Sequence, residues 1–113
     1  MFFETHNQLG RFCREKQYKD FMQKKFEEIN LHFIREYPIG ETGNIADFLI
    51  ENKIIIEAKA KQFILKDDYY QIQRYLQASN IKLGLLVNFR NKYIKPKRII
   101  RIDTESKNKY IKK

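Results

Sequence analysis

Three charged residues stand inside two short apolar runs at residues 45–59, where packing alone requires none: Asp47, Glu57 and Lys59. A charged side chain on a largely buried strand is costly unless it is paired or holds a metal ion. Two carboxylates that leave positions open to water bind a small hard cation such as Mg²⁺, usually beside a substrate phosphate. A lysine next to them can orient an attacking water and offset charge on a pentacovalent phosphorus. These residue types therefore outline a site for phosphodiester hydrolysis.

Whether these charges meet depends on how the two strands pair around the polar turn at residues 51–53. A two-residue turn would place Asp47 opposite Ala58, so that it faces away from Glu57. A three-residue loop would place Asp47 opposite Glu57, and opposed residues point to the same face. The turn has no glycine, which two-residue turns favour, and its central asparagine tolerates positive φ, so we predict the longer loop. The alternative is an amphipathic hairpin whose charged residues only form its solvated face.

The whole chain sets the limits for such a site. Its 113 residues suit one small domain with a single core. No apolar run is long enough for a membrane span, and the N-terminus does not resemble a signal peptide. The single cysteine, Cys13, excludes an internal disulfide framework and an all-cysteine metal site, and we expect a packed thiol in a reduced, cytoplasmic setting.

The positive charge is concentrated at one end of the chain. Residues 1–87 carry 13 Lys and Arg against 12 Asp and Glu, whereas residues 88–113 carry 10 against 2. A basic block of this density suits a nucleic-acid backbone, since each neutralised phosphate releases condensed counterions. An anionic membrane surface could also attract it, although no amphipathic helix accompanies the block. A solvated basic tail is the remaining interpretation.

Periodicity predicts an α/β fold with three layers and a mixed sheet. A buried strand that follows a helix after a strand should lie parallel to the earlier one, because such crossovers are right-handed. The expected domain covers residues 1–103, and residues 104–113 form a basic, polar tail. In chain order, the predicted elements are helices at 1–9 and 12–30, an edge strand at 31–39, the hairpin at 45–60, a helix at 66–78, a buried strand at 81–88 and a basic edge strand at 97–103.

The helical spacing also places polar side chains near the hairpin. Glu15 and Tyr18 lie on neighbouring positions of one helix face, and Gln71 and Tyr75 form a stripe that can face a site beside the hairpin. His6 is a possible ligand, but a lone histidine on an aromatic stripe is more often packed in the core.

In this order of elements, Asp47 followed by Glu57-Ala58-Lys59 resembles the PD-(D/E)XK nuclease superfamily. The run from Gln71 to Tyr75 matches the Q-x-x-x-Y motif of its RecB-like branch. The chain also resembles, more closely, the small bacterial family named for its G-x-x-E-x-x-Y motif. Gly10, Glu15 and Tyr18 correspond to that motif, and residues 6–10 match the His-x-x-Leu-Gly that precedes it. The stretches 52–60 and 82–89 resemble two further segments of the family.

The resemblance covers about residues 5–103, with two departures. Phe12 stands where the motif glycine would precede Glu15, so that only the earlier Gly10 remains. Ala46, rather than proline, precedes Asp47. Neither change removes a proposed catalytic residue, although Phe12 affects how the chain enters the helix that carries Glu15.

The resemblance implies a restriction-endonuclease-like core, in the order αβββαβ with an extra C-terminal strand, and a role for each matched residue. Asp47 and Glu57 would bind Mg²⁺ or Mn²⁺, with the carbonyl of Ala58 as third ligand, and Lys59 would position the attacking water. Glu15 would support the site or hold a second metal ion. Gln71 and Tyr75 would contact substrate or hold the lysine.

We therefore expect a metal-dependent nuclease that cleaves DNA with little sequence specificity, because no element resembles a reader of base edges. Two alternatives remain open: a non-catalytic nucleic-acid-binding domain on the same scaffold, and an RNA-directed nuclease. A homodimer is possible, because a chain of this size could need a second copy to enclose a duplex. The residues expected to contact the nucleic-acid backbone are Arg90, Lys92, Lys95, Lys97, Arg98 and Arg101.

Overall fold

The helices and strands follow one another in the predicted order. The structure, a computed structural model, describes residues 1–102, which form three helices and five strands. Residue 103, expected to end the last strand, and the predicted tail at 104–113 lie outside the described residues. The elements are α1 (Phe2–Leu9), α2 (Glu15–Glu28), β1 (Phe33–Pro38), β2 (Ile45–Ile50), β3 (Ile54–Lys59), α3 (Lys66–Ser79), β4 (Leu83–Asn88) and β5 (Lys97–Ile100).

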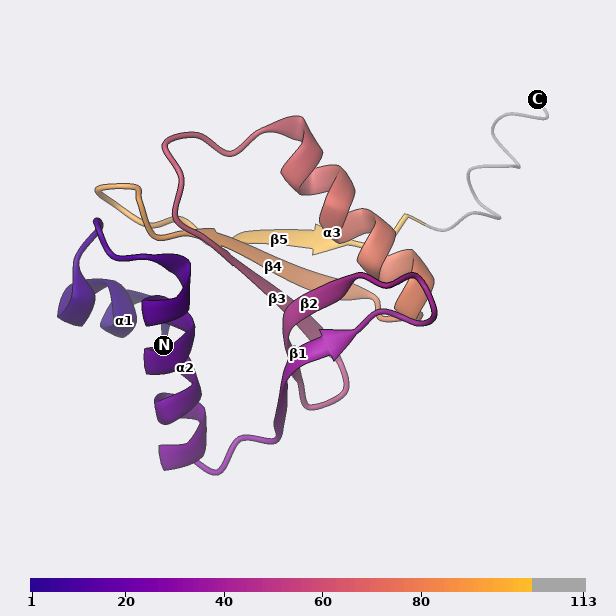
Figure 1. Cartoon of the computed structure of the whole chain (residues 1–113), viewed down its shortest axis with the longest axis horizontal. Helices are drawn as coiled ribbons and strands as arrows, with labels where there is room; N and C mark the ends of the chain where they lie inside the picture. The colour runs from indigo at the N-terminus through magenta and orange to yellow at the C-terminus, as the bar shows by residue number, and fades with distance from the viewer. Residues whose placement is uncertain (103–113) are drawn as a thin grey trace.

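The strands form one mixed sheet in the order β1-β2-β3-β4-β5. β1, β2 and β3 pair antiparallel, β3 and β4 pair parallel, and β5 returns antiparallel to β4. Helices α1 and α2 cover one face of the sheet and α3 covers the other (Figure 1). This arrangement confirms the three-layer α/β fold, the parallel crossover and the edge positions of the first and last strands. No helix within residues 1–102 has the length and apolar character to cross a membrane.

Each face of the sheet has its own apolar core. On the first face, α2 buries Tyr18, Met22 and Phe26, which recur every four residues and form one stripe. On the opposite face, α3 buries Ile72 and Leu76. Alternate residues of the central strands supply both cores, because side chains alternate between the two faces of a sheet.

The hairpin has the longer of the two loops considered above. Ile50 pairs with Ile54, which leaves the three residues 51–53 as the connection. Glu51 and Asn52 take positive φ values of 52° and 56°. A left-handed backbone suits asparagine better than most residues, because its short polar side chain bonds locally. The predicted register is therefore confirmed.

The loop-to-helix junctions hold α3 in place against the sheet. The Asp68 carboxylate accepts the N–H of Leu65 at 2.8 Å, and Asn80 ends the helix with φ 60° in the left-handed region. Gly84 on β4 allows the helix to approach closely, because a Cβ there would lie 2.6 Å from Ile72 Cδ1. The helix thus presents the same side to the sheet along its whole length.

The second helix begins later than the sequence predicts. Phe12 was expected as the first apolar residue of its stripe, but α2 starts at Glu15 and the Phe12 side chain is 74% exposed. The reason is a turn at Gly10, whose φ of 77° favours glycine. The buried Tyr18 hydroxyl fixes this turn, because it donates to the carbonyl of Gly10 and accepts the N–H of Cys13 at 3.2 Å.

Replacing Tyr18 with phenylalanine tests this anchor. The ring still stacks on Phe89, with a centroid distance of 4.3 Å, but two partly buried backbone groups lose their partner. We expect the free energy of unfolding to fall by about 1–3 kcal/mol. Thermal denaturation followed by circular dichroism measures it, with the exposed Tyr70→Phe as the control. Equal melting temperatures for the two variants would contradict the anchor.

Candidate active site

The candidate site lies where β2 and β3 stop pairing through their backbones. The last backbone pair is Phe48 with Ile56, and the next residues in this register are Asp47 and Glu57. There the side chains replace the ladder: Glu57 Oε1 accepts the N–H of Asp47 at 3.1 Å, and Asp47 Oδ2 accepts the N–H of Ala58 at 2.8 Å. The structure thus brings the two predicted carboxylates together across the strands.

A rotation of β2 at Asp47 aims its carboxylate toward β3. Phe48 packs in the core beneath α2, whereas Ala46, two residues away, packs in the core beneath α3. Alternate residues of a regular strand share a face, so the strand must turn over between them. The neighbouring strand β1 turns at the same level: Glu36 takes a positive φ of 56°, and the pairing of β1 with β2 is interrupted at Glu36 and Asp47.

Burial and charge make Glu57 the most perturbed acid of the site. Its side chain is only 4% exposed. Burial first, and then the neighbouring Asp47 carboxylate, raise the pKa of Glu57 to about 8, while the Lys59 ammonium acts in the opposite direction. Two acids held this close, with little water around them, favour any cation that can lie between them.

Helix α3 supplies the groups around Lys59. The Lys59 ammonium donates to Gln71 Oε1 at 2.9 Å, one turn before the buried Tyr75. Burial, followed by the charges of Glu57 and Asp47, raises the pKa of Tyr75. The predicted stripe of Gln71 and Tyr75 therefore does face the hairpin.

Two further charged groups contact the site, and the sequence analysis did not assign them to it. Lys19 on α2 pairs with Asp47 Oδ1 at 3.2 Å, and Asp68 on α3 lies 3.9 Å from the Lys59 ammonium. Asp68 also accepts two bonds from Lys61. Burial alone would raise the pKa of Asp68, but the Leu65 N–H and the Lys61 ammonium lower it.

Glu15 begins α2, one turn before Lys19, and its side chain is exposed. Its predicted role as a supporting carboxylate stays a prediction, because within residues 1–102 no three His, Cys, Asp or Glu side chains gather into a metal-binding group. The spacing from Glu15 to Lys19 is the one signal that could have pointed to Lys19, since residues four apart share a helix face.

The oxygen donors at this point suit a hard divalent cation. Lys59 directs its carbonyl to β4, where it accepts the N–H of Phe89 at 2.8 Å. Successive carbonyls along a strand point to opposite sides, so the carbonyl of Ala58 points toward β2 and Asp47. Two carboxylates and one carbonyl on the same side form the donor set that Mg²⁺ or Mn²⁺ prefers.

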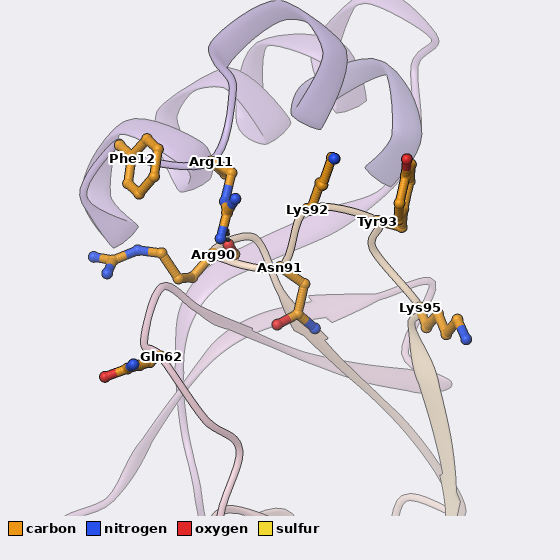
Figure 2. A pocket seen from close by; sticks show the side chains of 8 residues that line it. All are labelled: Arg11, Phe12, Gln62, Arg90, Asn91, Lys92, Tyr93 and Lys95. Carbon is orange, nitrogen blue, oxygen red and sulfur yellow. Dashed lines mark hydrogen bonds between the residues drawn. The ribbon is translucent and has the colours of Figure 1, made fainter.

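Three of the residues predicted to contact a nucleic-acid backbone, Arg90, Lys92 and Lys95, line an open hollow beside the site. Figure 2 shows this hollow, of about 730 Å³, between the loop that precedes α2, the loop after β3 and the loop after β4. We call it the basic hollow and define it by Arg11, Phe12, Arg90, Lys92, Tyr93 and Lys95. The loops after β3 and β4 leave the carboxyl ends of the two parallel strands, so the basic hollow lies at the same end of the sheet as Lys59.

The other three predicted basic residues lie apart from one another. Lys97 lines a smaller pocket next to the basic hollow, which shares Lys95 with it. Arg98 is its neighbour on β5 and therefore points to the opposite face of the sheet. Arg101 donates to Asn80 Oδ1 at 2.7 Å, beyond the far end of β5. The structure does not gather all six residues into one surface.

Comparison with known proteins bears on the family and the fold of the chain. A family model described as the PD-(D/E)XK nuclease superfamily matches residues 1–102. The crystal structure of SSO0001 superposes with a TM-score of 0.55 and 22% sequence identity, over 79% of this chain and 50% of that one. The chain thus spans half the length of that protein, and the likeness shows the fold. No curated protein sequence matches the chain.

The raised pKa of Glu57 predicts a pH-dependent stability in metal-free protein. The folded state holds the Glu57 proton up to about pH 8, whereas the unfolded chain releases it near the ordinary value of 4.5. The folded state therefore binds more protons in this window, and the free energy of unfolding should fall as pH rises from about 5 to 8, by up to a few kcal/mol.

Urea denaturation in EDTA across this pH range measures the slope, and Glu57→Gln should flatten it. The exposed Glu41→Gln is the control and should keep the wild-type slope. An unchanged slope in Glu57→Gln would show that Glu57 does not carry the effect.

Proposed function

Because the chain belongs to the PD-(D/E)XK nuclease superfamily, we propose that it is a divalent-metal-dependent nuclease that hydrolyses the phosphodiester bonds of DNA with little sequence specificity. The observation that carries the proposal is the exchange of hydrogen bonds between the Asp47 and Glu57 carboxylates and the opposite backbones. A binding scaffold needs no such pair of acids inside its sheet, since the arrangement costs desolvation and repulsion.

The residues around this pair take the following roles in the proposal. Asp47, Glu57 and the carbonyl of Ala58 hold Mg²⁺ or Mn²⁺, and Glu15 supports the site from the start of α2. A bound divalent ion supplies a more acidic water and offsets negative charge on the phosphate. Hydrolysis adds the oxygen of water to phosphorus and breaks the bond to the leaving sugar oxygen, which gains a proton.

Lys59 orients the attacking water and stabilises charge on the phosphate oxygens. Its ammonium is held at 2.9 Å by Gln71, so the donor is already oriented before substrate arrives. Tyr75, one helical turn after Gln71 and buried against the sheet, contacts the substrate or fixes the lysine. The Q-x-x-x-Y spacing puts Gln71 and Tyr75 on one helix face, as in the RecB-like branch, to which we assign the chain.

The basic residues make nucleic acid the fitting substrate. The sequence carries a net charge of +9, and four of its cations line the basic hollow next to the site: Arg11, Arg90, Lys92 and Lys95. No element of residues 1–102 has the form of a base reader, which supports low specificity. Pairing of two copies around a duplex stays a prediction.

One contact favours the rival function, a non-catalytic nucleic-acid-binding domain. The Lys19 ammonium already pairs with Asp47 Oδ1 at 3.2 Å, so a cation of the chain partly neutralises the acids. In a catalytic protein, a divalent ion must compete with this ammonium. In a non-catalytic one, the ion pair would be permanent and the chain would bind without turnover.

Lys59→Ala separates these two functions. Replacing this donor should lower Mg²⁺- or Mn²⁺-dependent cleavage of DNA by about 100-fold or more, while the fold persists. Incubation with linear, circular and single-stranded DNA, with an EDTA control, measures cleavage, and Lys53→Ala in the hairpin turn is the matched lysine control. Cleavage at the wild-type rate by Lys59→Ala would remove the catalytic claim.

Metal binding should also be visible without substrate. At pH 7.5, Mn²⁺ at about 100 times its dissociation constant should stabilise the wild-type protein by about 2.7 kcal/mol, because it binds only the folded site. Asp47→Asn should lose this rise in melting temperature, measured by scanning calorimetry, whereas Glu41→Gln should keep it. A rise of the same size in Asp47→Asn would place the ion elsewhere.

A further inference from the structure

Two aromatic rings stand in the basic hollow, although the fold does not need them there. Phe12 and Tyr93 are each 74% exposed. They belong to segments far apart in the sequence, the loop before α2 and the loop after β4, and both line the same hollow (Figure 2). Exposed large rings that gather in one concave place, with cations around them, indicate a binding surface.

Among residues 1–102, no acid neutralises the cations of the hollow. No acidic residue lines the hollow, and within residues 1–102 none of its four cations forms an ion pair: Arg11, Arg90, Lys92 and Lys95. Four unpaired cations favour a ligand with several negative charges.

Arg90 stands out among these cations. Its guanidinium carbon lies 5.5 Å from the centroid of the Phe12 ring, and its buried Nε has no hydrogen-bond partner within residues 1–102. Buried donors of folded proteins are normally satisfied. The guanidinium is therefore held by an aromatic face rather than by an acceptor, which leaves its outer N–H groups available for a phosphate.

The backbone of the hollow is firmly held, so the rings and cations keep their relative positions. Arg11 Nε donates to the carbonyl of Arg90, and a ring nitrogen of His6 bonds the carbonyl of Asn91, both at 2.9 Å. The buried Asn88 joins the loops after β3 and β4, because it donates to the carbonyl of Lys61 at 2.7 Å and accepts the N–H groups of Lys61 and Arg90.

From these observations we infer that the basic hollow binds an unpaired nucleotide strand, with bases stacked on Phe12 and Tyr93 and with phosphates held by Arg90, Lys92 and Lys95. Bases within a duplex already stack on their neighbours and offer no free face to a side chain. The inference names single-stranded nucleic acid, or a frayed end, as the substrate class, and in this respect it rests on the proposed nuclease function.

The connection between the hollow and the acids supports the same strand path. Lys61 follows Lys59 by two residues, and both ammonium groups approach Asp68, at 2.9 and 3.9 Å. Because the hollow and Lys59 lie at the same end of the sheet, we place the path of a strand held in the hollow past the end of β3, toward Lys59. The hollow fixes the strand, and the acids act on the phosphodiester that follows.

Fluorescence anisotropy with a short labelled oligonucleotide in EDTA tests the binding without cleavage. The double variant Phe12→Ala/Tyr93→Ala should weaken the binding of single-stranded DNA by about tenfold or more and leave the binding of the matching duplex unchanged. Phe12→Trp should keep wild-type binding, because it retains a stacking face. Phe3→Ala, which removes an exposed ring on α1 outside the hollow, is the control and should have no effect.

A second variant distinguishes stacking from charge. Lys92→Gln/Lys95→Gln should weaken single strand and duplex alike and reduce the salt dependence of binding, whereas the aromatic variant should leave that dependence unchanged. An aromatic variant that loses single strand and duplex equally, or neither, would overturn the inference. Tighter binding of single-stranded RNA, lost in the same aromatic variant, would support the stacking site and assign it to RNA.

The proposed function and this inference can fail separately. Lys59→Ala leaves the hollow intact, so it should bind single-stranded DNA as the wild type does while it no longer cleaves. If Lys59→Ala still cleaves, the nuclease mechanism fails and the binding inference stands. If the aromatic variant binds normally but cleavage requires Lys59, the nuclease stands and the hollow is not its strand-binding site.

Discussion

Between β2 and β3, two carboxylates do the work that backbone carbonyls do elsewhere in the sheet. The N–H of Asp47 bonds the side chain of Glu57, and the N–H of Ala58 bonds the side chain of Asp47. An unpaired buried amide would cost about as much as a lost hydrogen bond, so these acids also stabilise the end of the hairpin. The same two bonds determine where each carboxylate points, and the other groups of the site are arranged around them.

The strand rotation at Asp47 joins the two faces of the protein. A carboxylate on a regular strand would meet only one helical layer, but Asp47 contacts Lys19 of α2 and also neighbours the acid that faces α3. The positive φ of Glu36, opposite this point, is the backbone cost of the rotation. β1 is an edge strand, so it can take up this distortion without disturbing a further neighbour. The positive φ of Glu36 in the backbone therefore accompanies the ion pair of the Asp47 side chain with Lys19.

The fold and the central acids were predictable because local rules determine them. The periodicity, the absence of glycine in the turn and the tolerance of asparagine for positive φ together gave the register that places Asp47 opposite Glu57. The position of Gln71 on its helix and that of Lys59 on its strand were predictable from the type of element that carries each, and these positions bring the two side chains together. In contrast, the assignment of Phe12 to the second helix was wrong. The spacing of apolar residues does not reveal that the Tyr18 hydroxyl bonds the carbonyl of Gly10 and so keeps the turn before Glu15 out of the helix.

Contacts between layers were the least predictable part. Lys19 and Asp68 reach the site by long-range pairs whose partners are 28 residues and 9 residues away, and nothing in either local sequence specifies the partner. The sequence analysis treated the basic residues of 88–113 as one unit, but those that the structure describes do not form one surface. Neighbouring residues of β5 point to opposite faces of the sheet, and Arg101 bonds Asn80. Composition gave the sign of the charge, and only the tertiary structure gave its distribution.

The ends of β3 and β4 explain why the cations of the basic hollow and the carboxylates of the candidate site lie near one another without forming ion pairs. Asn88, which pairs with Lys59 in the parallel ladder, holds both following loops through side-chain bonds to Lys61 and Arg90. Lys61 and Lys59 share Asp68 as their ion-pair partner, so these two lysines are neutralised by helix α3. The Arg90 guanidinium lies over the Phe12 ring, and its Nε has no hydrogen-bond partner among residues 1–102. The cations of the hollow are thereby kept available for an anionic partner, while the acids keep the negative potential that a divalent cation requires.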